Sequence, residues 1–257
     1  MTNLIKMDLH RMFKSRSFRV CLILAAVFGF IGMPAIKLSS MLLRMIPGAG
    51  NLDALVPQSV TLSSLLSSPF PVMNCFLILL SVCYFCYADM EHGYIKNIAG
   101  QMPKKGYTIL SKYFAVILHN LIFIAVGIAA NTIGNVLFAK LIVDKDVLKS
   151  AGALGVRFLL LMGLCAILVL VTASLRSKTF GIVLSVVFGF QMTNLIYISI
   201  DTAVLMGLKK TIEIEKYMPD ELMWNTAPKL IPALPVAAVT IAVFLFLAIR
   251  IFDRRDV

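Results

Sequence analysis

Few side chains in the sequence could do chemistry together. Asp89, Glu91 and His92 form its one compact titratable cluster, of a kind that could bind a metal ion or transfer protons. Close neighbours on a helix point in different directions, so we expect neither a metal site nor a catalytic site there. Cys83 and Cys86 would share a helix face, but no His or carboxylate lies alongside, and we interpret both as packing residues.

Familiar motifs of ATP-binding and hydrolytic enzymes are missing from the sequence. It contains no G-x-x-x-x-G-K-[ST] phosphate loop, no H-E-x-x-H and no G-x-S-x-G. We therefore expect a chain that is not an enzyme and that binds no cofactor of its own. If ATP drives this protein, hydrolysis would belong to a separate subunit.

The composition indicates a membrane setting for these residues. Of the 257 residues, 60% are hydrophobic and 14% are charged, against about 45–50% and about 25% in soluble domains. A helix needs about 20 apolar residues to cross a bilayer. Six segments meet that length, and the sequence predicts an all-α membrane protein with a single transmembrane domain (1–257) of six transmembrane helices, near 18–36, 70–88, 114–138, 154–175, 179–200 and 232–252.

The net charge of +11 would suit either nucleic acid or an anionic membrane surface. Lys and Arg gather before the first span, in segment 89–112, between the fourth and fifth spans (Arg176 and Lys178) and after the sixth span. The remaining loops are nearly neutral. Because basic loops stay in the cytoplasm, we expect no nucleic-acid partner and both termini inside. The extracellular loops would then be 37–69, 139–153 and 201–231.

Two patterns suggest how helices meet the membrane and each other. Residues 2–17 place Ile5, Leu9, Met12 and Phe13 on one face, which predicts an amphipathic elbow helix in the inner membrane interface. The alternative is a plain basic flank that sets orientation. Small residues four apart, which allow close helix packing, recur in the fifth span. These residues are Gly181, Ser185, Gly189 and Thr193. Their stripe would serve intramolecular packing, a subunit interface or a substrate path.

The loop after the second span carries a resemblance to a known family. It contains an E-x-G-x-x-K-N run, a Pro103-Lys104-Lys105 turn and a Ser111-Lys112 pair, and the chain ends in Phe252-Asp253-Arg254-Arg255-Asp256. With the elbow helix, six spans and long loops after the first and fifth spans, the whole chain resembles ABC-2 type permease subunits of bacterial ABC transporters. Pro103-Lys104 departs from the S-R often found there.

The resemblance implies a type II (ABC-2) exporter fold in the bacterial cell membrane. Two copies of the chain would form a homodimer above two copies of an ABC ATP-binding subunit, which would bind ATP and Mg. Segment 89–112 would be the cytoplasmic coupling loop that docks on that subunit, the alternative being a solvated basic loop made only for topology. The implied coupling residues are Glu91, Gly93, Tyr94, Lys96, Asn97, Lys104 and Lys105.

The resemblance also implies a chamber between the two permeases. Its lining and packing residues would be Phe28, Gly29, Met33, Phe76, Phe85, Gly181, Ser185, Phe188, Gly189 and Thr193. Such an apolar lining suits an amphipathic or hydrophobic peptide better than an ion or a sugar. Small six-span permeases of this type resemble exporters of cytolytic peptides such as phenol-soluble modulins. They equally resemble lantibiotic immunity permeases, and a non-transporting membrane sensor or scaffold is a further alternative.

Overall fold

The computed structural model describes residues 2–44, 59–67, 72–91, 93–94, 105–208, 217–224 and 230–254. The described chain is almost entirely helical, with one pair of three-residue strands. Its elements are α1 (Thr2–Lys14), α2 (Arg16–Arg44), β1 (Ser59–Thr61), α3 (Leu62–Ser67), α4 (Val72–Glu91), α6 (Tyr107–Phe138), β2 (Lys140–Ile142), α7 (Val147–Val169), the π-helical turn η2 (Leu170–Ser174), α8 (Lys178–Gly189), α9 (Thr193–Leu208), α10 (Pro219–Trp224) and α11 (Leu230–Arg254).

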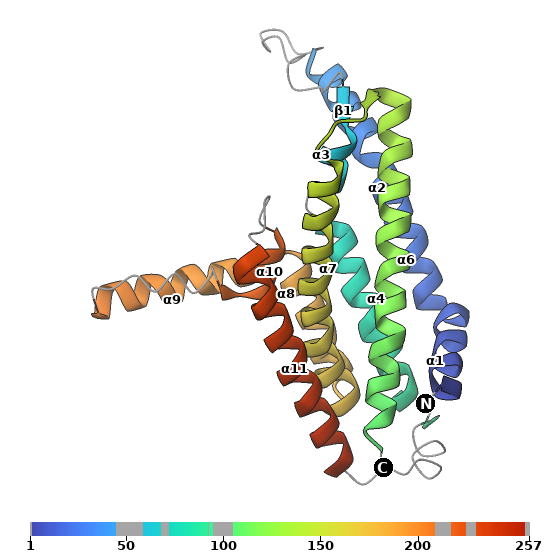
Figure 1. Cartoon of the computed structure of the whole chain (residues 1–257), viewed down its shortest axis with the longest axis vertical. Helices are drawn as coiled ribbons and strands as arrows, with labels where there is room; N and C mark the ends of the chain where they lie inside the picture. The colour runs from blue at the N-terminus through green and yellow to red at the C-terminus, as the bar shows by residue number, and fades with distance from the viewer. Residues whose placement is uncertain are drawn as a thin grey trace.

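The long helices α2, α4, α6, α7 and α11 run side by side in one bundle (Figure 1). Four described segments are long and apolar enough to cross a membrane, namely Val72–Glu91, Tyr107–Phe138, Val147–Ser174 and Pro232–Arg254. Two bent helix pairs raise the number to six if each pair counts as one span. The chain is therefore an all-α, multi-pass membrane protein with four to six candidate spans.

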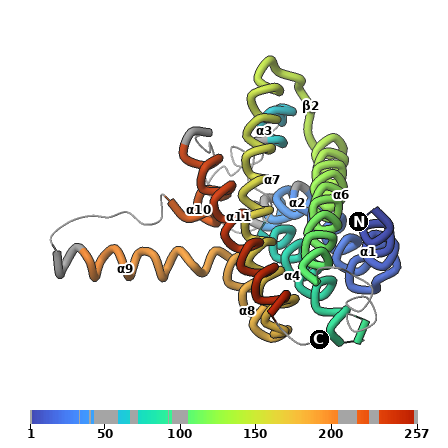
Figure 2. The backbone as a smooth tube through the Cα atoms, turned by 60° about the horizontal axis from the view of Figure 1, so that its bottom comes forward, coloured from blue at the N-terminus to red at the C-terminus, as the bar shows by residue number. Residues whose placement is uncertain are grey.

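The fifth predicted span, 179–200, is not one straight helix. It divides into α8 and α9, whose axes differ by 76°, and Gln191 between them has a φ of 57°. Helix α9 leaves the bundle sideways in both views (Figures 1 and 2). The 12 residues of α8 rise only about 18 Å, less than the roughly 30 Å of a hydrocarbon core.

Helices reach well into the loops that the sequence predicts. Helix α2 continues to Arg44, and α7 already begins at Val147. Between them, β1 pairs in parallel with β2, and the Asp144 carboxylate accepts hydrogen bonds from the backbone N–H and the hydroxyl of Ser63. We call residues 59–67 and 140–146 the distal cap, because they lie at the far end of the bundle from both termini (Figure 1).

Small residues bring helices close together inside this chain. A Cβ added to Gly134 of α6 would lie 2.6 Å from the carbonyl oxygen of Phe30 in α2, and one added to Gly29 would lie 3.2 Å from that of Gly127. Gly181, Ser185, Gly189 and Thr193 are all buried. Gly181 faces Thr172 of η2 and Cys83 of α4, and Gly189 faces the backbone of Phe76 in α4, so the two glycines pack against helices of the same chain.

The elbow prediction agrees with a helix at 2–14, which bends by 61° into the next helix at Ser15. Of the predicted apolar face, Met12 is buried and Leu9 packs against the core, but the fully buried side of α1 also includes Asp8. Leu4, Asp8 and Met12 are buried, whereas Phe13 is exposed and its ring lies 5.6 Å from that of Phe18. The difference arises because α1 packs on α6 through a stripe that includes a carboxylate, which an apolar pattern does not reveal.

Candidate functional site at the basal end

One short helix and four helix ends meet at the end of the bundle opposite the distal cap. They are helix α1, the last turns of α4 and α11, and the first turns of α6 and α8 (Figures 1 and 2). We call this region the basal end. Three charged side chains of the expected coupling segment, Asp89, Glu91 and Lys112, lie here, and each of them forms an ion pair.

Asp89, near the end of α4, is the centre of a buried ion-pair cluster. Its two carboxylate oxygens pair with the Arg11 guanidinium from α1 and the Lys112 ammonium from α6. Asp89 is 5% exposed and Lys112 is 2% exposed. Charges this deep are costly unless they are paired and hydrogen-bonded, so the cluster requires all three helices to stay in register.

Asp8 extends the cluster along α1. It accepts a hydrogen bond of 2.5 Å from the Ser111 hydroxyl of α6, and its carboxylate lies 3.6 Å from the Arg11 guanidinium one turn later in α1. The Arg11 guanidinium also stacks 3.9 Å from the centroid of the Tyr94 ring, a favourable cation–π geometry. Tyr94 therefore connects the expected coupling segment to the elbow helix.

Two further contacts attach α8 and α11 to the basal end. The Lys178 ammonium at the start of α8 lies 3.4 Å from the Glu91 carboxylate at the end of α4. The backbone N–H of Gly106 donates a 2.6 Å hydrogen bond to Asp253 of α11, and a Cβ at Gly106 would collide with Ile249. Any larger residue at position 106 would force the side chain of Ile249 to shift.

The expected coupling residues fall into two groups. One group lies at the end of α4 beside the cluster and consists of Glu91, Gly93 and Tyr94. Gly93 has a φ of 64°, which favours glycine. Lys105 lies just before α6, where its carbonyl accepts hydrogen bonds from the backbone and the hydroxyl of Thr108. The other predicted members, Lys96, Asn97 and Lys104, lie outside the described residues, as does His92.

The residues expected to line a chamber do not gather in one place within a single chain. Phe28 is 39% exposed on α2, whereas Phe85 is buried, 5.4 Å from the Lys112 ammonium. The Phe76 ring packs 5.0 Å from that of Phe190, and Phe188 borders a cavity beside α11. Met33 lies in α2, and its side chain is outside the described part of the chain.

The sequence analysis does not predict the cluster and, where it considers a member, assigns it another role. The five members are Asp8, Arg11, Asp89, Ser111 and Lys112. One signal was available: Asp8 and Arg11 are three positions apart on a basic helix, and an acid is unusual on its packed face. The sequence places Asp89 beside Glu91 and His92, at the start of the expected coupling segment. Its true partners come from 78 and 23 positions away.

A second polar network lies in the interior of the bundle, away from the Asp89 cluster. The Ser81 hydroxyl and the Asn120 amide lie 2.9 Å from the two ring nitrogens of His119, and the Asn120 amide also lies within 3.3 Å of two sulfur atoms. Cys83 and Cys86 are buried. Among the described residues, no three His, Cys, Asp or Glu side chains come together to hold a metal ion.

No model of a known protein family matches the sequence, and no curated protein matches it. The fold itself defines the class. The chain is a helical, multi-pass membrane protein in which charged side chains tie helix ends together at one end of the bundle.

Proposed function

We propose that the chain is the permease subunit of an ATP-driven exporter of the ABC-2 type, set in a bacterial cell membrane with both termini in the cytoplasm. The observation that carries the proposal is the Asp89 cluster. It joins α1, α4 and α6 on either side of the segment 92–104, which follows α4 and precedes α6. A partner that pushes on this segment acts on all three helices together.

The exposure of the segment's first residues supports a docking role. Glu91, Gly93 and Tyr94 are exposed, whereas Asp89 is buried two residues before them. The surface that a partner would contact is thus adjacent to the buried group that would receive the displacement. The basic residues Lys96 and Lys104 of the same segment, and Lys105 directly after it, complement acidic groups on a partner.

The partner in this proposal is an ATP-binding subunit in two copies, because the sequence has no phosphate loop. A second copy of the permease completes the assembly, since the described part of one chain provides at most six spans and its proposed chamber residues do not gather in one place there. The cargo is an amphipathic peptide. The apolar side chains exposed along α2, among them Val27, Phe28 and Ile31, support such a cargo over an ion or a sugar.

Co-purification tests the coupling assignment. Replacing Glu91, Gly93 and Lys96 together with alanine should abolish co-purification with an ATP-binding subunit, because two charged side chains are lost and a Cβ strains the backbone at the positive φ of Gly93. The matched control replaces Lys145, Asp146 and Lys149, three exposed residues at or beside the distal cap, and should leave the complex intact. A full-strength complex with the first variant would sink the assignment.

Transport into inside-out vesicles tests the cargo. A labelled amphipathic peptide should accumulate only when the vesicles contain both subunits and ATP. Accumulation that does not require ATP, or no accumulation of any peptide tried, would count against peptide export while leaving the coupling result unaffected.

A further inference from the structure

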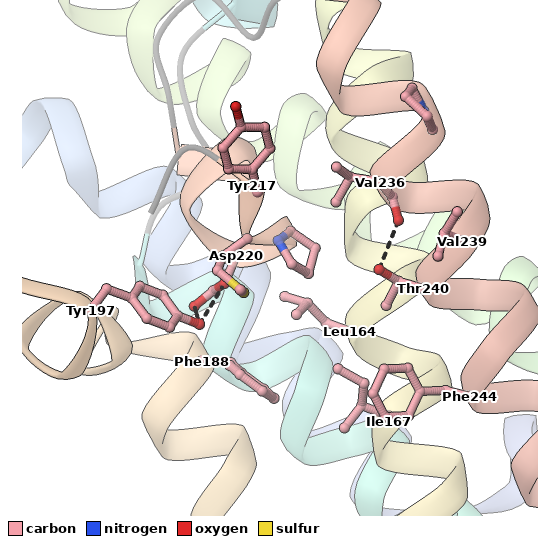
Figure 3. Close-up of a pocket in the computed structure, with 13 residues that line it drawn as sticks. Leu164, Ile167, Phe188, Tyr197, Tyr217, Asp220, Val236, Val239, Thr240 and Phe244 are labelled. Carbon is pink, nitrogen blue, oxygen red and sulfur yellow. Dashed lines mark hydrogen bonds between the residues drawn. The ribbon is translucent and has the colours of Figure 1, made fainter. Parts of the chain in front are cut away.

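A cavity of about 480 Å³ lies away from the basal end, between α7, α8, α9, α10 and α11 (Figure 3). Its volume falls within the roughly 300–1,000 Å³ of typical ligand pockets. The wall is mostly apolar and includes Leu164, Ile167, Phe188, Val236 and Phe244. A predominantly apolar wall of this kind suits a hydrocarbon chain.

One wall of the cavity carries a buried carboxylate. Asp220 of α10 is 2% exposed, and both of its oxygens lie 3.1 Å from the Tyr197 hydroxyl of α9. A hydroxyl has one hydrogen to donate, whereas an ionised carboxylate has about four acceptor positions. Among the described residues, no cationic side chain pairs with Asp220. A buried carboxylate with spare acceptors is a site for a cation that carries several donors.

The cavity opens toward the exposed side of α11. Val239 borders the cavity and is 62% exposed. Val243 and Phe246, one and two turns further along α11, are also exposed. Such a continuous apolar face on a membrane-spanning helix suits contact with lipid chains, so an amphiphile already in the bilayer reaches the cavity without crossing water.

We propose that this cavity binds a membrane lipid whose headgroup carries a primary ammonium group. The ammonium, with three N–H donors, occupies the free acceptor positions of Asp220 beside the Tyr197 hydroxyl. One acyl chain follows the apolar wall past Leu164 toward Phe244. The site is separate from the basal cluster and does not depend on the proposed transport function.

Native mass spectrometry of the purified, delipidated full chain tests the proposal. Three lipids with the same acyl chains are titrated, namely phosphatidylethanolamine, its trimethylated analogue phosphatidylcholine, and phosphatidylglycerol. The unchanged protein should bind phosphatidylethanolamine about tenfold more tightly than the other two, as expected for charge-assisted hydrogen bonds. Equal binding of the three lipids by the unchanged protein would overturn the proposal.

Variants assign the preference to the cavity. Asp220→Asn should remove it, whereas Tyr197→Phe should retain it because the carboxylate remains. Asp146→Asn, an exposed acid near the distal cap, is the matched control and should bind as the unchanged protein does. Val239→Trp keeps Asp220 but fills the opening from an exposed position, so it tests the site even if Asp220→Asn does not fold. It should weaken binding of phosphatidylethanolamine by about tenfold.

Two outcomes would contradict the assignment. If Asp220→Asn and Val239→Trp both keep the preference for phosphatidylethanolamine, the lipid binds elsewhere on the protein. A lysine-containing amphipathic peptide is titrated in the same way. If the unchanged chain binds this peptide but shows no lipid preference, and Val239→Trp abolishes peptide binding, the cavity is assigned to peptide instead.

Discussion

At the scale of single residues, the Asp89 cluster is an arrangement of charges that compensate one another. Two carboxylates, Asp8 and Asp89, face two cations, Arg11 and Lys112, so the group is formally neutral. Buried ion pairs contribute little net stability when intact, but removing one partner is costly. The cluster therefore serves to hold helices in a defined arrangement, and single substitutions within it should reveal that.

Lys112→Met should destabilise the protein by about 3–5 kcal/mol, because it leaves Asp89 buried with one of its two cations lost. Thermal unfolding in detergent measures the effect. The control is Lys178→Met, which breaks a partly exposed pair with Glu91 and should cost about 1 kcal/mol or less. The double variant Asp89→Leu/Lys112→Met should recover most of the loss. Equal losses for the two single variants would show that burial does not matter here.

Contacts between individual residues were the least predictable from the sequence. The small-residue stripe of the fifth span and the buried character of Cys83 and Cys86 follow from spacing and composition alone. The contact between Asp8 and Ser111 does not, because it joins residues 103 positions apart and both are ordinary polar residues in a basic helix and a span entrance. Pairing across helices is a tertiary property, so a single sequence does not encode it in any local pattern.

At the scale of elements, the close packing of α8 on α4 is set by glycine. A Cβ on Gly189 would lie 2.6 Å from the Phe76 Cα, and backbone cannot swing aside as a side-chain tip can. Gly189→Ala should destabilise the protein by about 1–3 kcal/mol through overpacking. Gly152→Ala in α7, where nothing lies within 4 Å of the new Cβ, is the control, and it should be neutral or stabilising by about 0.5–1 kcal/mol.

The distal cap should respond to acid. Hydrogen bonding from the Ser63 side chain lowers the pKa of Asp144 below its ordinary 3.8. A lowered pKa stabilises the folded cap at every pH above 3.8, and this contribution is lost as the pH falls through the lowered value. The hydrogen-exchange protection factors of residues 59–67 should therefore fall as the pH drops below 3.8.

Ser63→Ala should weaken that pH dependence, because the carboxylate loses the hydrogen bond that lowers its pKa. Ser39→Ala is the matched control, since its hydroxyl bonds to a carbonyl of its own helix, α2. It should leave the acid response of the cap as it is in the unchanged protein. The same response in Ser63→Ala would show that another group titrates in the cap.

The elements themselves were largely predictable, with informative exceptions. Long apolar runs identify α4, α6, α7 and α11 to within a few residues at most ends, because a membrane span has a strict length. The division of 179–200 into α8 and α9 escapes the same reasoning. Its apolar run is continuous, and the bend is set by Gln191 in a left-handed conformation, which hydropathy does not register.

At the scale of the whole molecule, the charge distribution makes orientation testable. Lys14 is exposed at the basal end and Lys145 is exposed at the distal cap, while all five native cysteines are buried. A membrane-impermeant maleimide should label Lys145→Cys in intact cells and Lys14→Cys only after permeabilisation. The unchanged chain should remain unlabelled in both conditions. The reverse pattern would place the termini outside.

The near contact of α2 and α6 has a mechanical consequence. Where two helix backbones touch at Gly29 and Gly134, neither helix can slide without forcing a main-chain carbonyl into the other, so the pair moves as a single stiff rod. Helix α6 begins at the Asp89 cluster and leads directly into β2 of the distal cap. Its 32 residues rise roughly 48 Å. A tilt imposed at one surface of the membrane therefore reaches the opposite surface with little loss along the way.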